Sequence, residues 1–336
     1  MTKMELVIQN FDNQIIEESN IVTTEKRHFI EANTIEVSLE HLKNECTIPV
    51  FAKDNETTIS HYEFITTTKN VIQEILGYQG DLIPDIRVSH VIKGRIPQAI
   101  GKPASELLEH EKTIYYERMA FVIEIPEISE IVNGNKLNLC VGGVRAYNQE
   151  NLFSKKSIEK FKVFVGFQNK VCTNLCISTD GLLDDLRVSS VHELGEKIHL
   201  LINQYDKKEH LRKMQKMNDF FLNENQFAHL IGKMKLYPFL EKEFKKTLFP
   251  LKVNDTQINT MVRDYHLDAN FSKSTDDKIS LWNVYNLFTE ANKSAYIDSN
   301  LERNVNAYEF MNYIGNLLEN NQSNYFLHNN IIAFSS

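Results

Sequence analysis

The chain has 336 residues, of which 42% are hydrophobic and 24% charged, with only 12 glycines and 7 prolines. This composition is that of an ordered globular protein and excludes an intrinsically disordered chain. The net charge of −8 excludes a polycation that binds nucleic acid indiscriminately.

Two features of the sequence predict the compartment. No apolar run approaches the roughly 20 residues that a membrane-spanning helix needs, so we expect no membrane partner. The first residues, Met1 to Val7, lack the basic and apolar regions of a signal peptide, which favours a cytoplasmic protein. The four cysteines are too few and too scattered for a disulfide scaffold, and we expect all of them to be free thiols: Cys46, Cys140, Cys172 and Cys176.

The N-terminal third contains few regular elements. Residues 1–26 are polar and acidic without a hydrophobic period, which predicts a flexible N-terminal arm. The spacing of apolar residues then predicts a short helix from Ser38 to Asn44 and a longer one from Thr66 to Leu76, where Gly77 provides a stop.

From about residue 86 to residue 178 the apolar period becomes two, as in β-strands. Asn133-Gly134-Asn135 is a hairpin-type turn, and the other connections are mostly short, so we expect an antiparallel sheet. Gly142-Gly143 inside a strand indicates a bulge or a close backbone approach. The expected strands are residues 87–95, 114–125, 136–147, 161–167 and 171–178.

After the turn Thr179-Asp180-Gly181 the apolar period becomes helical as far as about residue 320, and Ser190 with Glu193 forms a predicted capping box. The fold class is therefore α+β, with a central antiparallel sheet (about residues 86–178) packed with a C-terminal helical region. The predicted parts are the arm (1–26), the sheet domain (27–181), the helical region (182–320), packed on the sheet in one compact unit, and a C-terminal tail (321–336).

The sequence contains no recognisable catalytic motif. It lacks a phosphate-binding glycine loop, a dinucleotide fingerprint and a zinc-protease helix, and its eleven histidines are dispersed. We therefore expect no cofactor, and the lack of these motifs favours a nonenzymatic protein over an enzyme. Asp180, Asp184 and Asp185 gather three carboxylates that could hold Mg²⁺ in a nuclease, but an Asp-Gly turn followed by solvated acids explains them equally well, so no metal site is predicted.

Basic and aromatic residues share a parity within several expected strands. Arginine and lysine contact phosphates and aromatic rings stack on bases, so one sheet face with both suits single-stranded nucleic acid. We expect the residues concerned to lie within one concave or flat surface: Arg87, Lys93, Arg95, Tyr116, Arg118, Arg145 and Tyr147. The alternative is that they face helices or solvent, because bulges change the phase of a strand.

A second basic region follows the sheet. From Lys207 to Lys246 there are ten Lys or Arg residues against five Asp or Glu, which leaves a net charge of about −13 on the remainder of the chain. An excess of this kind suits an anionic partner, although solvated helix faces produce the same pattern. The candidate contacts are Lys207, Lys208, Arg212 and Lys213.

Several blocks resemble the bacterial "domain of unknown function 3871" family over roughly residues 26–318. They include Arg87 to Pro97 (RVSHVIKGRIP) and Gly142 to Asn148 (GGVRAYN), with residues 26–34, 113–121, 161–181 and 292–298. Residues 171–175 and 282–289 are more weakly similar to the phage- and plasmid-like "domain of unknown function 932" group. These resemblances imply a bacterial gene on a plasmid, phage or conjugative element. They imply no catalytic residue, because neither family has an assigned active site.

Three functional hypotheses follow. The first is a nonenzymatic nucleic-acid-binding accessory of a mobile element, with single-stranded DNA as its partner for annealing or protection. The second is a protein-interaction or host-interference factor, whose acidic part binds or mimics a protein partner or which self-associates. The third is a metal-dependent nuclease that uses Asp180, Asp184 and Asp185, with Glu193 as a further candidate.

Overall fold

The computed structural model describes residues 27–47, 58–77, 80–99, 101–149 and 158–328. Its strands are β1 (Ile35–Glu36), β2 (Pro84–Val88), β3 (Val91–Arg95), β4 (Lys112–Tyr116), β5 (Arg118–Val132), β6 (Asn135–Ala146), β7 (Glu159–Asn169), β8 (Leu175–Cys176), β9 (Leu182–Val188), β10 (Phe221–Asn223) and β11 (Lys278–Ser280). Its helices are α2 (Leu39–Asn44), α3 (His61–Leu76), α4 (Val191–Gln204), α5 (Lys207–Lys216), α6 (Glu224–Leu236), α7 (Lys242–Lys246), α8 (Asp255–Leu267), α9 (Leu281–Asn292) and α10 (Ile297–Glu319).

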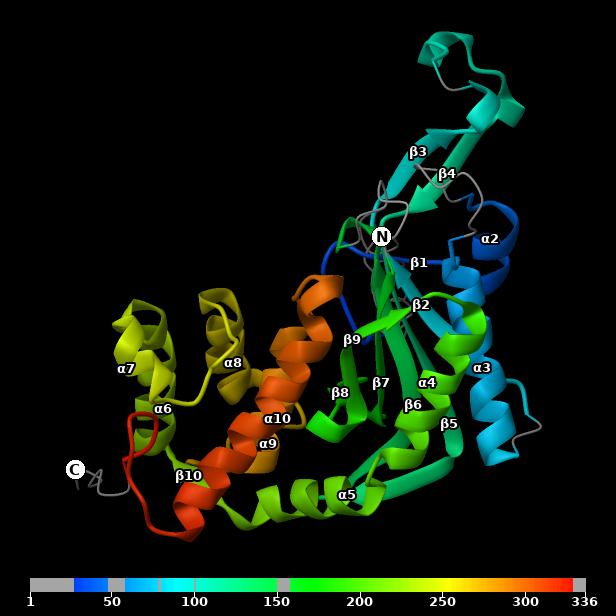
Figure 1. The fold of residues 1–336 in the computed structure, drawn as a ribbon. Coiled ribbons are helices and arrows are strands. Elements are labelled where there is room, and N and C mark those ends of the chain that lie inside the picture. Colours follow the sequence, from blue (N-terminus) through cyan, green and yellow to red (C-terminus); the bar gives the residue numbers. More distant parts are fainter. Residues whose placement is uncertain (1–26, 48–57, 78–79, 100, 150–157, 329–336) are drawn as a thin grey trace, which may run out of the picture.

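The centre is a seven-stranded antiparallel sheet in the order β1-β2-β5-β6-β7-β8, with β9 also paired to β7. Helices α3 and α4 cover one side of the sheet, and α9 and α10 lie on the other side (Figure 1). Helices α6, α7 and α8 form a lobe at one end (Figure 1). The expected α+β class, with an antiparallel sheet and C-terminal helices, is confirmed.

The sheet is buried on both faces, which explains the dense apolar sequence of β6 and β7. On the α3 side, the Phe64 ring meets Phe121 and Phe161 edge-on, with centroids 5.0 and 4.8 Å away. A side chain at Gly143 would place its Cβ 2.4 Å from the Phe64 ring, so the expected close approach at this glycine is confirmed. On the other face, Ile297 and Leu301 of α10 pack into a second apolar cluster with strand residues.

One expected strand, residues 87–95, is in fact two strands in different sheets. β2 pairs with β5 in the main sheet, whereas β3 pairs with β4 in a two-stranded arm that projects from the body (Figure 1). The break lies at Ser89, whose amide donates to the Arg118 carbonyl at 2.9 Å and whose hydroxyl accepts from the Arg118 amide at 3.2 Å. The chain leaves and re-enters the main sheet at these two residues, so strand parity does not extend across them.

Two other boundaries differ from the expectation. Residues 182–188 form strand β9, and the helical part of the chain begins only at Val191. Their mixed polar and apolar sequence arises because β9 is a sheet edge with exposed acids. The predicted strand 171–178 shortens to β8 because a turn at residues 170–173 precedes it. Ser190 is the expected N-cap, since its side chain accepts from the Glu193 amide.

The described cysteines include all four in the chain, and the structure pairs none of them. Within the described ranges, each helix is too short or too polar to cross a bilayer.

Candidate functional site

Arg145, at the end of β6, is a core residue. Its side chain is fully buried and pairs with the carboxylate of Glu159 on β7. It also donates to the Ile59 carbonyl, and its guanidinium lies 4.3 Å from the centroid of the Phe161 ring. Both Glu159 carboxylate oxygens also accept from the Ile59 amide, at 3.0 and 3.2 Å. Every charged atom is therefore turned inward, toward a partner within the protein.

Tyr147 shares this buried environment. It is 2% exposed, lies under the Arg145 guanidinium at 4.6 Å, and stacks on the His61 ring at 4.6 Å. Burial, assisted by the Arg145 charge, lowers the pKa of His61 to about 3, so the imidazole is neutral. This stack belongs to the interface between the sheet and α3.

Two more of the candidate residues are buried. Arg87 is 7% exposed, and its guanidinium donates to the Thr34 hydroxyl at 3.0 Å and the Thr34 carbonyl at 2.8 Å. Tyr116 is 4% exposed and contacts His41. The prediction of one shared surface is therefore wrong. Helices α2 and α3 and the Thr34 segment cover Arg87, Tyr116, Arg145 and Tyr147, and the others lie on or beside the arm.

The remaining sheet candidates are closer to solvent. Lys93 on β3 is exposed and has no ion pair with another described residue. Arg95 is partly buried, and its guanidinium donates to the Lys102 carbonyl within the arm. Arg118 lies 3.7 Å from Glu117 and 3.8 Å from Asp298, at contact distances longer than a hydrogen bond.

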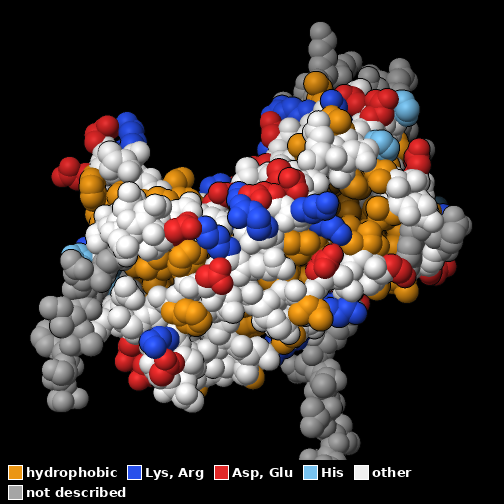
Figure 2. Space-filling model, turned by 90° about the horizontal axis from the view of Figure 1, so that it is seen from below, with side chains coloured by type: hydrophobic (Ala, Val, Ile, Leu, Met, Phe, Trp, Pro, Cys, Tyr) orange, Lys and Arg blue, Asp and Glu red, His pale blue; other side chains and the backbone are white. Residues whose placement is uncertain are grey.

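The basic residues of α5 are largely neutralised. Arg212 makes a bidentate pair with Glu209 at 2.7 and 2.8 Å, and Lys213 lies 3.7 Å from the same carboxylate. Lys207 lies 3.5 Å from Glu130, whereas Lys208 is exposed and has no ion pair within the described ranges. α5 is at the bottom of Figure 1, and on that face basic and acidic side chains stand side by side (Figure 2). This face is not a continuous basic stripe.

The acidic residues considered for a nuclease also have hydrogen-bond or ion-pair partners within the protein. Asp180 accepts from the Asp206 amide at 2.9 Å, and Asp185 pairs with Lys160 and Arg187 at 3.2 and 3.1 Å. Glu193 accepts from the Ser189 amide at 2.8 Å. Over the part of the chain that the structure describes, no three His, Cys, Asp or Glu residues are placed to hold a metal ion.

Asp184 belongs to a charged cluster that joins the sheet to α10. The Lys162 ammonium, on β7, lies 2.8 Å from Asp184 and 2.5 Å from Glu302, and Lys252 reaches the same Glu302 at 2.9 Å. Burial of Glu302 raises its pKa, but the hydrogen bonds and charges of the two lysines outweigh burial and lower the pKa to about 2. The ion pairs of this cluster connect β7 to β9 and α10.

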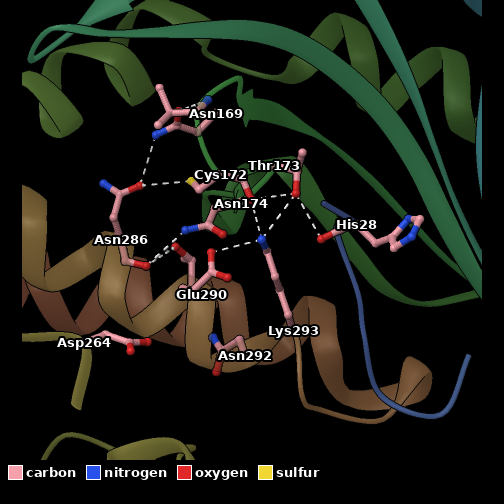
Figure 3. A network of polar contacts seen from close by, with 12 residues as sticks. His28, Asn169, Cys172, Thr173, Asn174, Asp264, Asn286, Glu290, Asn292 and Lys293 are labelled. Carbon is pink, nitrogen blue, oxygen red and sulfur yellow. Dashed lines mark hydrogen bonds and ion pairs between the residues drawn. The ribbon is translucent and has the colours of Figure 1, made fainter. Parts of the chain in front are cut away.

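A buried polar network fastens the β7–β8 turn to α9 (Figure 3). Lys293, 1% exposed, donates to the Cys172 carbonyl and to the Thr173 hydroxyl at 3.2 Å, and pairs with Glu290 at 2.9 Å. Burial raises the pKa of Glu290 despite this partner. Thr173 has a φ of 62°, a left-handed conformation that a threonine adopts only when its surroundings enforce it.

Asparagines complete this network. The Asn286 side-chain oxygen accepts from Asn169 at 3.1 Å, and the Asn174 amide group donates to the Asn286 carbonyl at 3.0 Å (Figure 3). Further along α9, Asn292 donates to Asn304 at 3.0 Å. Because all these groups point at one another, the network holds the sheet edge and helices in register.

The described pockets include one of about 590 Å³ between α3 and α4. Asn70 and Glu74 line it from α3, and His192, Glu196 and His199 line it from α4. His192 lies 3.5 Å from Glu196, and His199 contacts Asn203 at 2.9 Å, so these polar groups interact along their own helix.

Sequence reasoning missed a surface at the tip of the helical lobe. Phe239 is 86% exposed, Leu236 56% and Phe244 46%, and lysines flank all three. Residues 233–246 contain five lysines against two glutamates, a net charge of +3. We call this the lysine–phenylalanine surface; it comprises Lys235, Leu236, Phe239, Lys242, Phe244, Lys245 and Lys246.

The lysines of this surface are only partly neutralised. Lys242 is exposed without an ion pair to another described residue, and Lys245 donates to the Pro238 carbonyl at 2.6 Å. Lys235 lies 3.3 Å from Asp255, and Lys246 lies 2.8 Å from Glu243. At least two positive charges therefore lack a carboxylate partner in the described structure. The sequence did contain a signal for this surface. Residues 237–246, YPFLEKEFKK, place two phenylalanines among lysines and outside any apolar stripe.

Comparison with known proteins identifies a family and no characterised relative. No curated protein and no solved structure matches the chain. The weaker likeness to the 932 group is not shown by these comparisons. One family does match, over residues 10–327, which is nearly the whole chain. The protein therefore belongs to the family described as "Domain of unknown function, B. Theta Gene description (DUF3871)".

Proposed function

We propose that this protein binds single-stranded nucleic acid, without cutting it, through the lysine–phenylalanine surface. The observation that supports this proposal best is Phe239, 86% exposed on a surface with a local net positive charge. A phenylalanine ring that is this exposed can stack on an unpaired base, and stacking tolerates any base sequence. The lysine charges are suited to the phosphates on either side.

The charge distribution favours a polyanion over an apolar protein partner. Lys242 and Lys245 stand beside the exposed rings without a carboxylate partner. The proposal keeps the basic stretch from Lys207 to Lys246 as the contact to nucleic acid, but places its centre on α7 and not on α5. The accessory role on a mobile element that the resemblance suggested would fit such binding, as protection or pairing of exposed strands.

The test is fluorescence anisotropy of a labelled oligothymidylate at increasing salt. Binding should weaken as ionic strength rises, with a slope of about −0.7 per neutralised phosphate for single strands. Lys242→Ala and Lys245→Ala should each make the slope shallower by about that amount. Phe239→Ala should weaken binding by about 1–3 kcal/mol and leave the slope unchanged.

Matched controls come from other surfaces. Lys197→Ala on α4 removes an exposed lysine, and Leu267→Ala at the end of α8 removes an apolar side chain that is 74% exposed. Both should leave the affinity unchanged. Absence of binding at low salt would refute the proposal, as would equal losses in the control variants. Binding to phosphatidylserine vesicles or to an acidic protein, without binding to the oligonucleotide, would also refute it and reassign the surface.

A further inference from the structure

The segment that follows α10 returns to the helical lobe and is anchored beside α6 (Figure 1). Phe326 and Leu327 are fully buried. The Tyr325 ring meets the Phe244 ring edge-on, with centroids 5.9 Å apart, and the Tyr325 hydroxyl donates to the Lys233 carbonyl at 3.2 Å. This anchor fixes the place on the lobe from which the rest of the chain continues.

The chain continues from a point beside the first half of α6. His328 is the last residue that the structure describes, and its ring centroid lies 6.3 Å from that of His229 on α6. The segment 329–336 follows with the sequence NNIIAFSS, which carries no charge. Its large apolar side chains gain free energy when they leave water, so they favour an apolar contact: Ile331, Ile332 and Phe334.

An exposed apolar face of α6 begins next to His229. Ala228, Gly232 and Leu236 stand at positions i, i+4 and i+8 and so share one face of the helix, and Phe239 follows in the turn after α6. All four residues are exposed, Leu236 at 56% and Phe239 at 86%. A side-chain carbon placed at Gly232 would meet no other atom within 4 Å, so another stretch of chain can approach the helix closely there.

The segment 329–336 is long enough to cover this face. From Ala228 to Phe239 a helix rises about 16 Å, at about 1.5 Å per residue. Eight extended residues span up to about 26–29 Å. A segment that starts at His328 can therefore follow α6 as far as Phe239. Because it is tethered beside the face, its effective concentration is of the order of millimolar, which favours it over a second copy of the chain.

We propose that the segment 329–336 docks on this face of α6 as far as Phe239 and competes with nucleic acid for the lysine–phenylalanine surface. The docking stands on the anchor, the reach and the apolar face. The competition rests on the proposed function. Since the segment has no charge, it covers the apolar residues and leaves the lysines in water, where they remain available to phosphates.

Photocrosslinking of the full-length protein tests the docking. With p-benzoylphenylalanine in place of Phe239, irradiation should join position 239 to residues 331–334 of the same chain, located by peptide mass spectrometry. The matched control has the same substitution at Leu267, which is 74% exposed at the end of α8, and should give no such crosslink. The absence of the crosslink from position 239 in the folded protein would overturn the docking. A crosslink between two chains would overturn it as well and would assign this face to a dimer.

Anisotropy with labelled oligothymidylate tests the competition. The full-length variant with Ile331→Ser, Ile332→Ser and Phe334→Ser should bind about threefold more tightly than the wild type or better, because a surface that is covered for about two thirds of the time loses affinity by that factor. A control variant with Asn329→Ser and Asn330→Ser should bind like the wild type. Equal affinities of the wild type and the triple variant would overturn the competition. If neither bound the oligonucleotide, the proposed function would fail instead, and the crosslink would still decide the docking.

Discussion

The sheet and the helical lobe use the same pair of residue types in opposite ways. In the sheet, Arg145 lies between the Tyr147 and Phe161 rings and is fully buried. In the lobe, Phe239 is 86% exposed beside lysines. A cation next to an aromatic ring is therefore part of the scaffold in the sheet, whereas in the lobe it forms an exposed surface.

The difference lies in what replaces water around the charge. Arg145 has a carboxylate, a backbone carbonyl and two ring faces around it, so its desolvation is compensated inside the protein. Lys242 is exposed to solvent, so its charge is available to an external anion. Burial and partners therefore distinguish scaffold from site, and residue type does not.

The largest expected effect is at Arg145. Arg145→Met should lower the free energy of unfolding by about 3–5 kcal/mol, because Glu159 and the Ile59 carbonyl stay buried without their partner. Urea unfolding followed by circular dichroism measures this loss. The oligonucleotide affinity of the folded fraction should not change.

Two companion variants sharpen this result. Arg118→Met removes an arginine that is 27% exposed and lies 3.7–3.8 Å from its acidic neighbours, and should cost less than about 1 kcal/mol. Arg145→Met combined with Glu159→Leu should recover much of the loss, since no charge remains unpaired. A loss below about 1 kcal/mol for Arg145→Met alone would show that this pair is not part of the scaffold.

The next effect depends on pH. The pKa of Glu302 is about 2 in the folded protein, below its ordinary value of 4.5, so its ionised form stabilises the fold. This contribution is complete above about pH 4.5 and disappears as the pH falls through about 2. Glu302→Gln should therefore cost about 1–2 kcal/mol at neutral pH, allowing for its partial exposure, and progressively less between pH 4.5 and 2.

Glu243→Gln is the control, because Glu243 forms an exposed pair with Lys246 and is itself 83% exposed. That variant should change the stability by less than about 0.5 kcal/mol at any pH. If the free energy of unfolding fell equally with decreasing pH in the wild type and in Glu302→Gln, the Lys162 cluster would not stabilise the packing of α10 on the sheet.

The fold class was predictable because it depends on hydrophobic period, which is a local property. The period of two in residues 114–167 and the helical period after Val191 required no knowledge of distant residues. The errors arose at Ser89 and at residues 182–188, where hydrogen bonds to Arg118 and to β7 decide the strand. These partners are 29 and about 20 residues away in the sequence.

The candidate site was less predictable for the same reason. The parity of Arg145 and Tyr147 on β6 is real, but parity does not reveal that α3 covers that face or that Glu159 provides the counter-charge. Nor does the sequence reveal that Tyr116 meets His41 across 75 residues. Phe239 had a local signal in the sequence, because two phenylalanines stand among lysines there. The basic stretch was assessed by its charges alone, so these two rings were overlooked.

The smallest expected effect on stability is at Phe239, in the helical lobe. Phe239→Ala should change the free energy of unfolding by less than about 0.5 kcal/mol, because an 86% exposed ring loses little contact with the protein. Phe161→Ala removes the same ring from a fully buried position beside Arg145 and should cost about 3–5 kcal/mol. The same pair of variants should rank in the opposite order in the anisotropy assay, with binding weakened only in Phe239→Ala. If Phe239→Ala instead destabilised the protein by more than about 1 kcal/mol, its ring would pack within the fold. A loss of binding could then not be assigned to stacking, and the lobe would be scaffold like the sheet.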